Sequence, residues 1–166
     1  MIETPAALDI RDVADLRDAV AAANAKGTRI ALRGGGSKAL IGTPAKAESE
    51  ITLSRLSGII DYDPAELVIT AAAGTRLADI AAELESRGQM LGFEPVDYGP
   101  LFGANAGAAT LGGTIAANCS GPRRFAAGAA RDHFIGFEAV SGRGEIFKGG
   151  AKVVKNVTGY DLPKLL

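Results

Sequence analysis

The sequence predicts an α+β protein with two lobes, a small α/β lobe followed by a mainly antiparallel β lobe with helices. Residues 12–38 have the pattern of a helix, a strand and a glycine loop in that order. A second amphipathic segment at 77–87 is followed by a change of pattern, and a hairpin pattern covers 134–148. With 166 residues, 47% of them hydrophobic, the chain can bury one good core or two packed lobes. We place the approximate lobes at 1–90 and 91–166, with no flexible linker between them.

The first helix is expected over Asp12–Lys26. Its apolar residues recur every three or four positions, acidic residues stand near its start, and Gly27 is placed to end it. The apolar-rich segment Arg29–Arg33 is predicted to be a short strand. It runs directly into the run Gly34–Lys38, so a strand delivers the chain into a glycine loop.

Two further strands and a second helix complete the first lobe. Ile51–Leu53 and Leu67–Ala71 read as short strands, and Asp61–Pro64 is predicted to form a turn between them. Leu77–Arg87 is an amphipathic segment that Gly88 stops. We expect its apolar side to cover the same sheet.

The second lobe has a different pattern. Leu91–Asn118 is rich in Gly and Ala and follows neither a two-residue nor a 3.6-residue period, so it is predicted to be loop with short segments. Phe134–Val140 and Glu145–Lys148 flank Ser141–Gly144, which is typical of a β-hairpin. This part of the chain is therefore expected to be antiparallel.

Composition and charge exclude several classes of function. The net charge is −1 and the 18 Lys and Arg residues are scattered, so no nucleic-acid partner is expected. No apolar stretch is long enough for a membrane span and the N-terminus lacks the pattern of a secretion signal, which favours a cytoplasmic protein. With Cys119 and His133 as the single cysteine and histidine, no metal site is expected. We interpret Cys119 as an inert core thiol and His133 as structural or exposed.

Glycine is the informative residue type. The chain has 22 glycines and only 5% aromatic residues, and the glycines cluster. Consecutive glycines can turn backbone N–H groups toward an anion, so Gly34–Gly36 could hold a pyrophosphate, with Ser37 as a further donor. Arg33 or Lys38 could add positive charge, or lie in solvent. The alternative is a purely structural role, in which the glycines only make tight turns. The run matches neither the P-loop pattern nor G-x-G-x-x-G.

Two other clusters have alternative interpretations. Ala109–Gly121 combines small residues with hydroxyls and an amide, and could lie flat against a large planar ligand. It could instead be a small-residue helix packed against the sheet. In Gly128–Gly136, Arg131 and Asp132 precede an apolar strand, and they could simply pair with each other.

Five segments resemble one known family in order and spacing. They are RGGGSK at 33–38, AAGTRLADIAAEL at 72–84, FEP at 93–95, ATLGGTIAANCSG at 109–121 and GAARDHFIGFEAVSGRGEIFKGG at 128–150. Together they resemble the vanillyl-alcohol-oxidase type of FAD-binding domain, also called the PCMH type. Within it, the likeness is closest to the FAD-binding subunit, the E subunit, of bacterial glycolate oxidase, which also has a segment like KVVKNVTGYDLPKLL at 152–166.

The resemblance implies a two-lobed domain that holds FAD between its lobes. Residues implied at the pyrophosphate are Arg33, Gly34, Gly35, Gly36, Ser37 and Lys38. Residues implied at the flavin or its ribityl chain are Pro95, Thr110, Gly112, Gly113, Thr114, Asn118 and Gly121. Residues implied on the adenosine side are Asp132 and Ile135.

Two departures from the family pattern limit what the resemblance implies. Members that attach FAD covalently often carry a histidine in the first glycine loop, where this chain has Ser37 and Lys38, so noncovalent FAD is expected. The substrate-binding cap domain is absent from the 166 residues, so no catalytic acid or base can be named. Lys155, Asn156, Tyr160 and Asp161 could approach the flavin or brace the cap.

The implied activity is the oxidation of a small 2-hydroxy acid such as glycolate, with the flavin accepting a hydride equivalent. The implied partners are other oxidase subunits, including an iron–sulfur subunit, and the chain alone is expected to be inactive. One alternative keeps the fold but makes the chain the FAD domain of an enolpyruvyl-UDP-sugar reductase. Others are a non-catalytic FAD-binding module, or a protein in which the glycines bind nothing.

Overall fold

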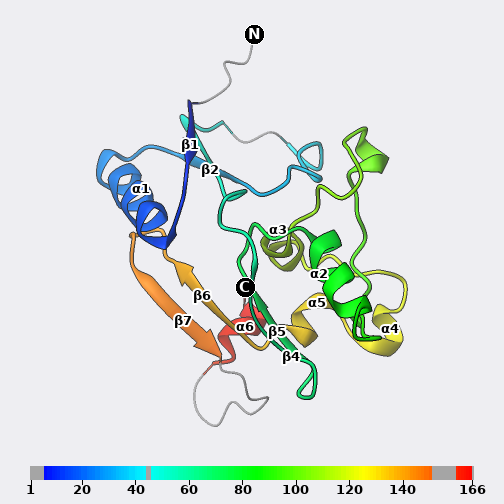
Figure 1. Cartoon of the computed structure of the whole chain (residues 1–166). Coiled ribbons are helices and arrows are strands. Elements are labelled where there is room, and N and C mark those ends of the chain that lie inside the picture. Colours follow the sequence, from blue (N-terminus) through cyan, green and yellow to red (C-terminus); the bar gives the residue numbers. More distant parts are fainter. Residues whose placement is uncertain (1–5, 44–45, 151–159, 166) are drawn as a thin grey trace.

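Three strands near the N-terminus form a parallel sheet in the computed structural model, which describes residues 6–43, 46–150 and 160–165 (Figure 1). Both β1 (Ala6–Asp9) and β2 (Ile30–Arg33) pair with β3 (Ser49–Thr52), which is therefore the central strand. Ile51 of β3 is fully buried and lies opposite a leucine in each neighbouring strand. The sequence predicted β2 and β3 to within two residues but missed β1.

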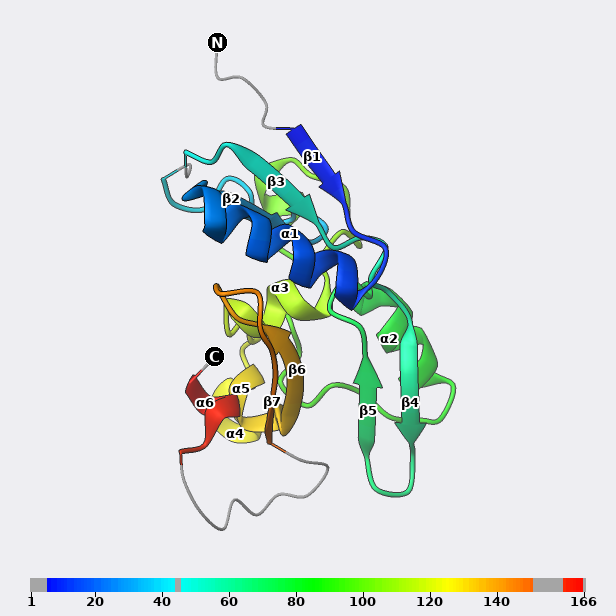
Figure 2. The same cartoon turned by 90° about the vertical axis from the view of Figure 1, so that its left-hand side faces the viewer.

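The helix α1 (Val13–Lys26) begins and ends where the sequence predicts. Asp12 caps its start, accepting a hydrogen bond from the backbone N–H of Asp15 at 2.8 Å, and Gly27 ends it with φ at 64°. In Figure 2, α1 lies across the parallel sheet, between the sheet and the hairpin formed by β6 (Gly136–Val140) and β7 (Ile146–Gly150). It contacts β6, so the N-terminal helix packs against this hairpin.

An antiparallel hairpin follows, formed by β4 (Ile59–Asp63) and β5 (Val68–Ala71). The predicted turn at Asp61–Pro64 is wrong in part, because the strand continues to Asp63 and the chain turns after it. The strand β4 was not predicted because acidic residues, which are depleted in strands, occupy two of its five positions. Gln89 anchors the hairpin tip, since it accepts from the Tyr62 hydroxyl at 2.8 Å and donates to the Pro64 carbonyl at 2.9 Å.

The second long helix, α2 (Leu77–Glu85), ends two residues before the predicted position. Its buried side is formed by Leu77, Ile80 and Leu84, at the spacing that predicted an amphipathic helix. Gly88, at φ 69°, lies in the turn that follows the helix. The helix packs away from the parallel sheet, beside the β4–β5 hairpin (Figure 2).

Short helices and one hairpin make up the described residues beyond position 90, which confirms the α+β class. The hairpin turn at Ser141 is confirmed, with β6 beginning two residues and β7 one residue later than predicted, and a helical turn occupies 130–133 ahead of β6. No helix in the described ranges is long and apolar enough to cross a membrane. The lobe boundary near residue 90 stays a prediction. The elements are η1 (Pro100–Phe102), α3 (Leu111–Ala116), α4 (Arg124–Ala127), α5 (Ala130–His133), β6 (Gly136–Val140), β7 (Ile146–Gly150) and α6 (Leu162–Leu165).

Candidate cofactor-binding site

The glycine loop that follows β2 packs directly against the segment that leads into α3. A Cβ atom on Gly34 would overlap the hydroxyl of Thr110, and one on Gly35 would stand 2.6 Å from the carbonyl carbon of Ala108. Real Cβ atoms essentially never come within 3.0 Å of such atoms. These two glycines are therefore required where one loop touches another, and the contact brings two of the predicted clusters together.

Backbone donors in this loop are free to bind a ligand. Within the described ranges, the N–H groups of residues 35–38 and of Gly113 donate to no other protein group. Gly36 takes φ at 73°, in the left-handed region that glycine favours. Ser37 is buried with 4% of its surface exposed, and Lys38 Nζ lies 3.8 Å from the point where a Cβ on Gly113 would be. The loop therefore offers several N–H groups, and the ammonium group of Lys38 lies close to Gly113.

Arg33 is occupied elsewhere. Its guanidinium forms an ion pair with Glu50 on the neighbouring strand, with Nη2 and Oε2 at 2.9 Å. Lys38 has no carboxylate partner among the described residues. Arg33 and Lys38 were the two cationic side chains predicted near a bound anion, and Lys38 is the one without a carboxylate partner among the described residues.

Residues 74–77, which lie in a segment that carries the resemblance but had no predicted cofactor contact, hold the other side of residues 109–111. Leu77 N–H donates to the Ala109 carbonyl at 2.9 Å, and Leu111 N–H donates to the Thr75 carbonyl at 2.9 Å. Thr75 is 2% exposed, and its hydroxyl accepts from Gly58 N–H at 2.9 Å and donates to the Ala72 carbonyl at 2.7 Å. The signal that could have found it was a glycine, Gly74, within a run of small residues.

Inside α3, Thr114 is completely buried and its hydroxyl has no hydrogen-bond partner among the described residues. Gly112 packs against Ala73, and its N–H donates to the carbonyl of that residue at 2.8 Å. Burying an unpaired hydroxyl costs about 1–3 kcal/mol, so Thr114 lowers the free energy of unfolding. Unsatisfied polar groups of this kind are uncommon in native proteins and call for an explanation.

The remaining predicted residues form a second cluster, around α5. The amide oxygen of Asn118 accepts from the N–H of Arg131 at 3.1 Å, and Asp132 accepts from the N–H of Ala129 at 2.8 Å. This backbone hydrogen bond, and then the nearby ammonium of Lys164, lower the pKa of Asp132. The idea that Arg131 and Asp132 simply pair with each other is wrong, because the Asp132 carboxylate binds these other groups instead.

Gly121 and Ile135 are positioned by backbone contacts. A Cβ on Gly121 would overlap the carbonyl of Glu94, and Gly121 N–H donates to the Phe93 carbonyl at 2.9 Å. Ile135 is half-buried, and its carbonyl lies where a Cβ on Gly150 would be. Of the four residues named at the end of the chain, Lys155 and Asn156 lie outside the described residues, and Tyr160 and Asp161 are exposed.

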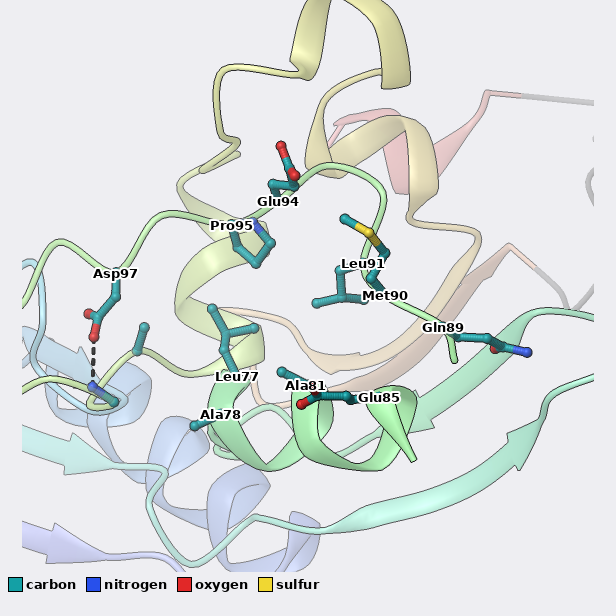
Figure 3. Close-up of a pocket in the computed structure, with 12 residues that line it drawn as sticks. Leu77, Ala78, Ala81, Glu85, Gln89, Met90, Leu91, Glu94, Pro95 and Asp97 are labelled. Atoms are coloured by element: carbon teal, nitrogen blue, oxygen red, sulfur yellow. Dashed lines mark hydrogen bonds between the residues drawn. The ribbon is translucent and has the colours of Figure 1, made fainter. Parts of the chain in front are cut away.

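A pocket of about 590 Å³ lies next to the loop contact, between α2 and residues 89–97 (Figure 3). Gly107 and Ala109 line it, whereas the alternate residues Ala108 and Thr110 contact the glycine loop. The segment 107–110 therefore separates the pocket from the loop. Pro95 is the predicted site residue that lines the pocket, and Asp97 braces its rim by accepting from Gly107 N–H at 2.7 Å.

Neither the histidine nor the cysteine has the surroundings of a catalytic group. His133 Nε2 lies 2.7 Å from the Ala127 carbonyl oxygen, and its ring packs 5.5 Å from that of Phe93, which confirms a structural role. Cys119 is a free, buried thiol, as expected. Among the described residues, no group of three or more His, Cys, Asp or Glu side chains could hold a metal ion.

A model of the FAD binding domain family matches residues 5–150. The chain belongs to this FAD-binding family. Its cofactor is FAD, which confirms what the resemblance implied, whereas the glycine loop by itself suggested only a pyrophosphate. The residue-by-residue assignment of cofactor contacts stays a prediction.

Relatives of this FAD-binding domain include two curated proteins that the chain covers only in part. It is 43% identical over 140 residues to glycolate oxidase subunit GlcE of Escherichia coli, covering 84% of this chain and 37% of that protein. It is 34% identical over 116 residues to D-lactate dehydrogenase of Anaerostipes hadrus, covering 70% and 22%. The structure of alkyldihydroxyacetonephosphate synthase superimposes with a TM-score of 0.73 at 20% identity, over 96% of this chain and 28% of that one, which confirms the fold.

Proposed function

We propose that this chain is the FAD-binding part of an oxidoreductase that oxidises a small 2-hydroxy acid such as glycolate. The observation that carries the site is the set of unpaired donors at the glycine loop: the N–H groups of residues 35–38 and Gly113, with the ammonium of Lys38 beside them. Several N–H groups converging with one cation suit a doubly charged pyrophosphate. The two curated relatives, which are named for glycolate and D-lactate, support the substrate class.

In this proposal the protein binds and orients, and bound FAD supplies the electron-accepting chemistry. Lys38, rather than Arg33, neutralises the pyrophosphate, because Arg33 is already paired with Glu50. Pro95, Thr110 and Thr114 would line the flavin end of the cofactor, and the unpaired hydroxyl of Thr114 would be a hydrogen-bonding group there. The loop N–H groups and the Thr114 hydroxyl have no protein partner among the described residues, so the residues present fit the cofactor.

We infer that FAD is held noncovalently. Covalent attachment needs a nucleophilic side chain, and the single histidine is bound to a backbone carbonyl while the single cysteine is buried. We also propose that the enzyme is cytoplasmic and works with other oxidase subunits, including an iron–sulfur subunit. The relative that is named as a glycolate oxidase subunit supports an assembly of more than one chain.

FAD binding at this loop can be tested with one pair of lysine variants. Flavin fluorescence titration should show that Lys38→Met weakens FAD about tenfold or more, the effect of losing one charge-assisted hydrogen bond. Riboflavin has no pyrophosphate, so its affinity should not change. Lys26→Met, which removes an exposed charge from the end of α1, is the matched control and should bind FAD as the wild type does.

Three results would count against the proposal. Failure of the folded wild-type protein to bind FAD would show that the glycine loop is not an FAD site. Equal FAD affinity in wild type and Lys38→Met would show that Lys38 does not interact with the pyrophosphate. Flavin that stays with acid-precipitated protein would show covalent attachment. Anaerobic bleaching of the flavin by glycolate or D-lactate in the assembled enzyme tests the substrate class, and a non-catalytic module would show no bleaching.

A further inference from the structure

The short helix α5 is held in place by several side chains. At its start, the N–H groups of Ala129, Ala130 and Arg131 donate to Asp132, Ser120 and Asn118 at 2.8, 2.9 and 3.1 Å. Within the helix, Lys164 Nζ donates to the carbonyl of Arg131 at 2.7 Å and lies 3.6 Å from Asp132 Oδ1. A helix of four residues has no stability of its own, so these contacts determine where it lies.

Lys164 belongs to α6, and its contacts connect α6 to the cofactor loops in three steps. Helix α6 packs on α5, and α5 packs on α3. Asn118 joins α5 to the end of α3, where its own backbone takes φ at 45°. The first turn of α3 carries the free N–H of Gly113 and follows Thr110, which contacts the glycine loop. Figure 2 shows α6, α5 and α3 stacked in this order.

We propose that Lys164 is a positioning residue for FAD binding, acting through α5 and Asn118 on the N-terminal turn of α3. The proposal rests on FAD binding at the glycine loop, as argued above. It also gives Asn118 and Asp132 a different role from the one implied by the resemblance. One side-chain oxygen of each accepts a backbone N–H, so we assign both residues to orienting the loops that hold FAD.

The physical reason is that one ammonium group satisfies two acceptors on α5. Lys164 is 39% exposed, so water shields it only in part, and a hydrogen bond to a charged donor is stronger than a neutral one. Without it, the Arg131 carbonyl loses this hydrogen bond and the Asp132 carboxylate loses its cation. Helix α5 is then free to shift, and the N–H of Gly113 is no longer held toward the anion.

The test compares Lys164→Met with Lys164→Arg, using Lys148→Met as the matched control. Lys148 is also a lysine in an exposed ion pair, with Glu138 at 2.7 Å, but it lies on β7 away from α5. By fluorescence titration, Lys164→Met should weaken FAD about two- to tenfold, the effect of one lost hydrogen bond. Lys164→Arg and Lys148→Met should stay within about twofold of the wild type, and melting without FAD confirms that each variant is folded.

A double-mutant cycle separates positioning from a general loss of stability. Asn118→Gly removes the amide but accepts the left-handed backbone. If Lys164 acts through Asn118, the double variant should lose less affinity than the product of the two single losses. Multiplicative losses, or unchanged affinity in a folded Lys164→Met, overturn the inference. Failure of the wild type to bind FAD overturns the proposed site itself, so the two failures are distinguishable.

Discussion

Replacing Gly35 with alanine tests the contact between the glycine loop and the segment 108–110. The new Cβ would stand 2.6 Å from the carbonyl carbon of Ala108 and closer still to its oxygen. Carbon atoms in contact prefer about 3.5–4.0 Å, so two stretches of backbone must separate. Overpacking of this kind costs about 1–3 kcal/mol, which for a chain of this length lowers the melting temperature by about 2–12 °C.

The assay is thermal melting with and without FAD. Because the movement separates the free donors of the loop from Gly113, FAD should also raise the melting temperature of Gly35→Ala less than that of the wild type. Gly142→Ala is the control, since no heavy atom lies within 4 Å of its Cβ position and its backbone is not left-handed. If Gly35→Ala melts and responds to FAD as Gly142→Ala does, the loop contact does not have the role argued here.

Two further predictions concern single side chains. Thr114→Val removes the unpaired buried hydroxyl while keeping nearly the same side-chain shape. This variant should melt at a higher temperature than the wild type without FAD, and it should bind FAD more weakly. A lower melting temperature without FAD would show that the hydroxyl has a partner. Arg29 lowers the pKa of Glu48 from 4.5 to about 2, so this ion pair stabilises the fold above pH 4.5 and the stabilisation is lost as pH falls through 2. Glu48→Gln should therefore melt slightly below the wild type at neutral pH, with a gap that closes toward pH 2; a gap that widens on acidification would contradict this.

Local signals predicted the elements whose causes are local. Apolar spacing, acidic residues near the start and a terminal glycine defined α1 to within one residue. The strand β2 with its glycine loop, and the hairpin turn at Ser141, were predicted from residue types within a few positions. The ends of α1 and of the hairpin turn are satisfied by neighbouring atoms, and β2 was recognisable from its residue types although it pairs with β3.

Elements that depend on distant partners could not be predicted. The strand β1 is only four residues long and exists because β3 pairs with it from more than forty residues away. The helix α5 was not predicted, since its residues were interpreted only as preceding a strand, and it is held by Ser120, Asn118 and Lys164. No local pattern contains this information, because the stabilising groups come from other parts of the chain.

The glycine loop shows why a correct prediction of a site can rest on an incomplete reason. The sequence suggested that consecutive glycines let the backbone approach a ligand. In the structure, Gly34 and Gly35 let the backbone approach Thr110 and Ala108, and Gly36 supplies a left-handed turn. We interpret the ligand site as a consequence of protein packing: the two loops are held close together, N–H groups in both have no protein partner among the described residues, and Lys38 lies close to Gly113. A substitution that loosens the packing should therefore weaken cofactor binding even where the new side chain does not touch the cofactor.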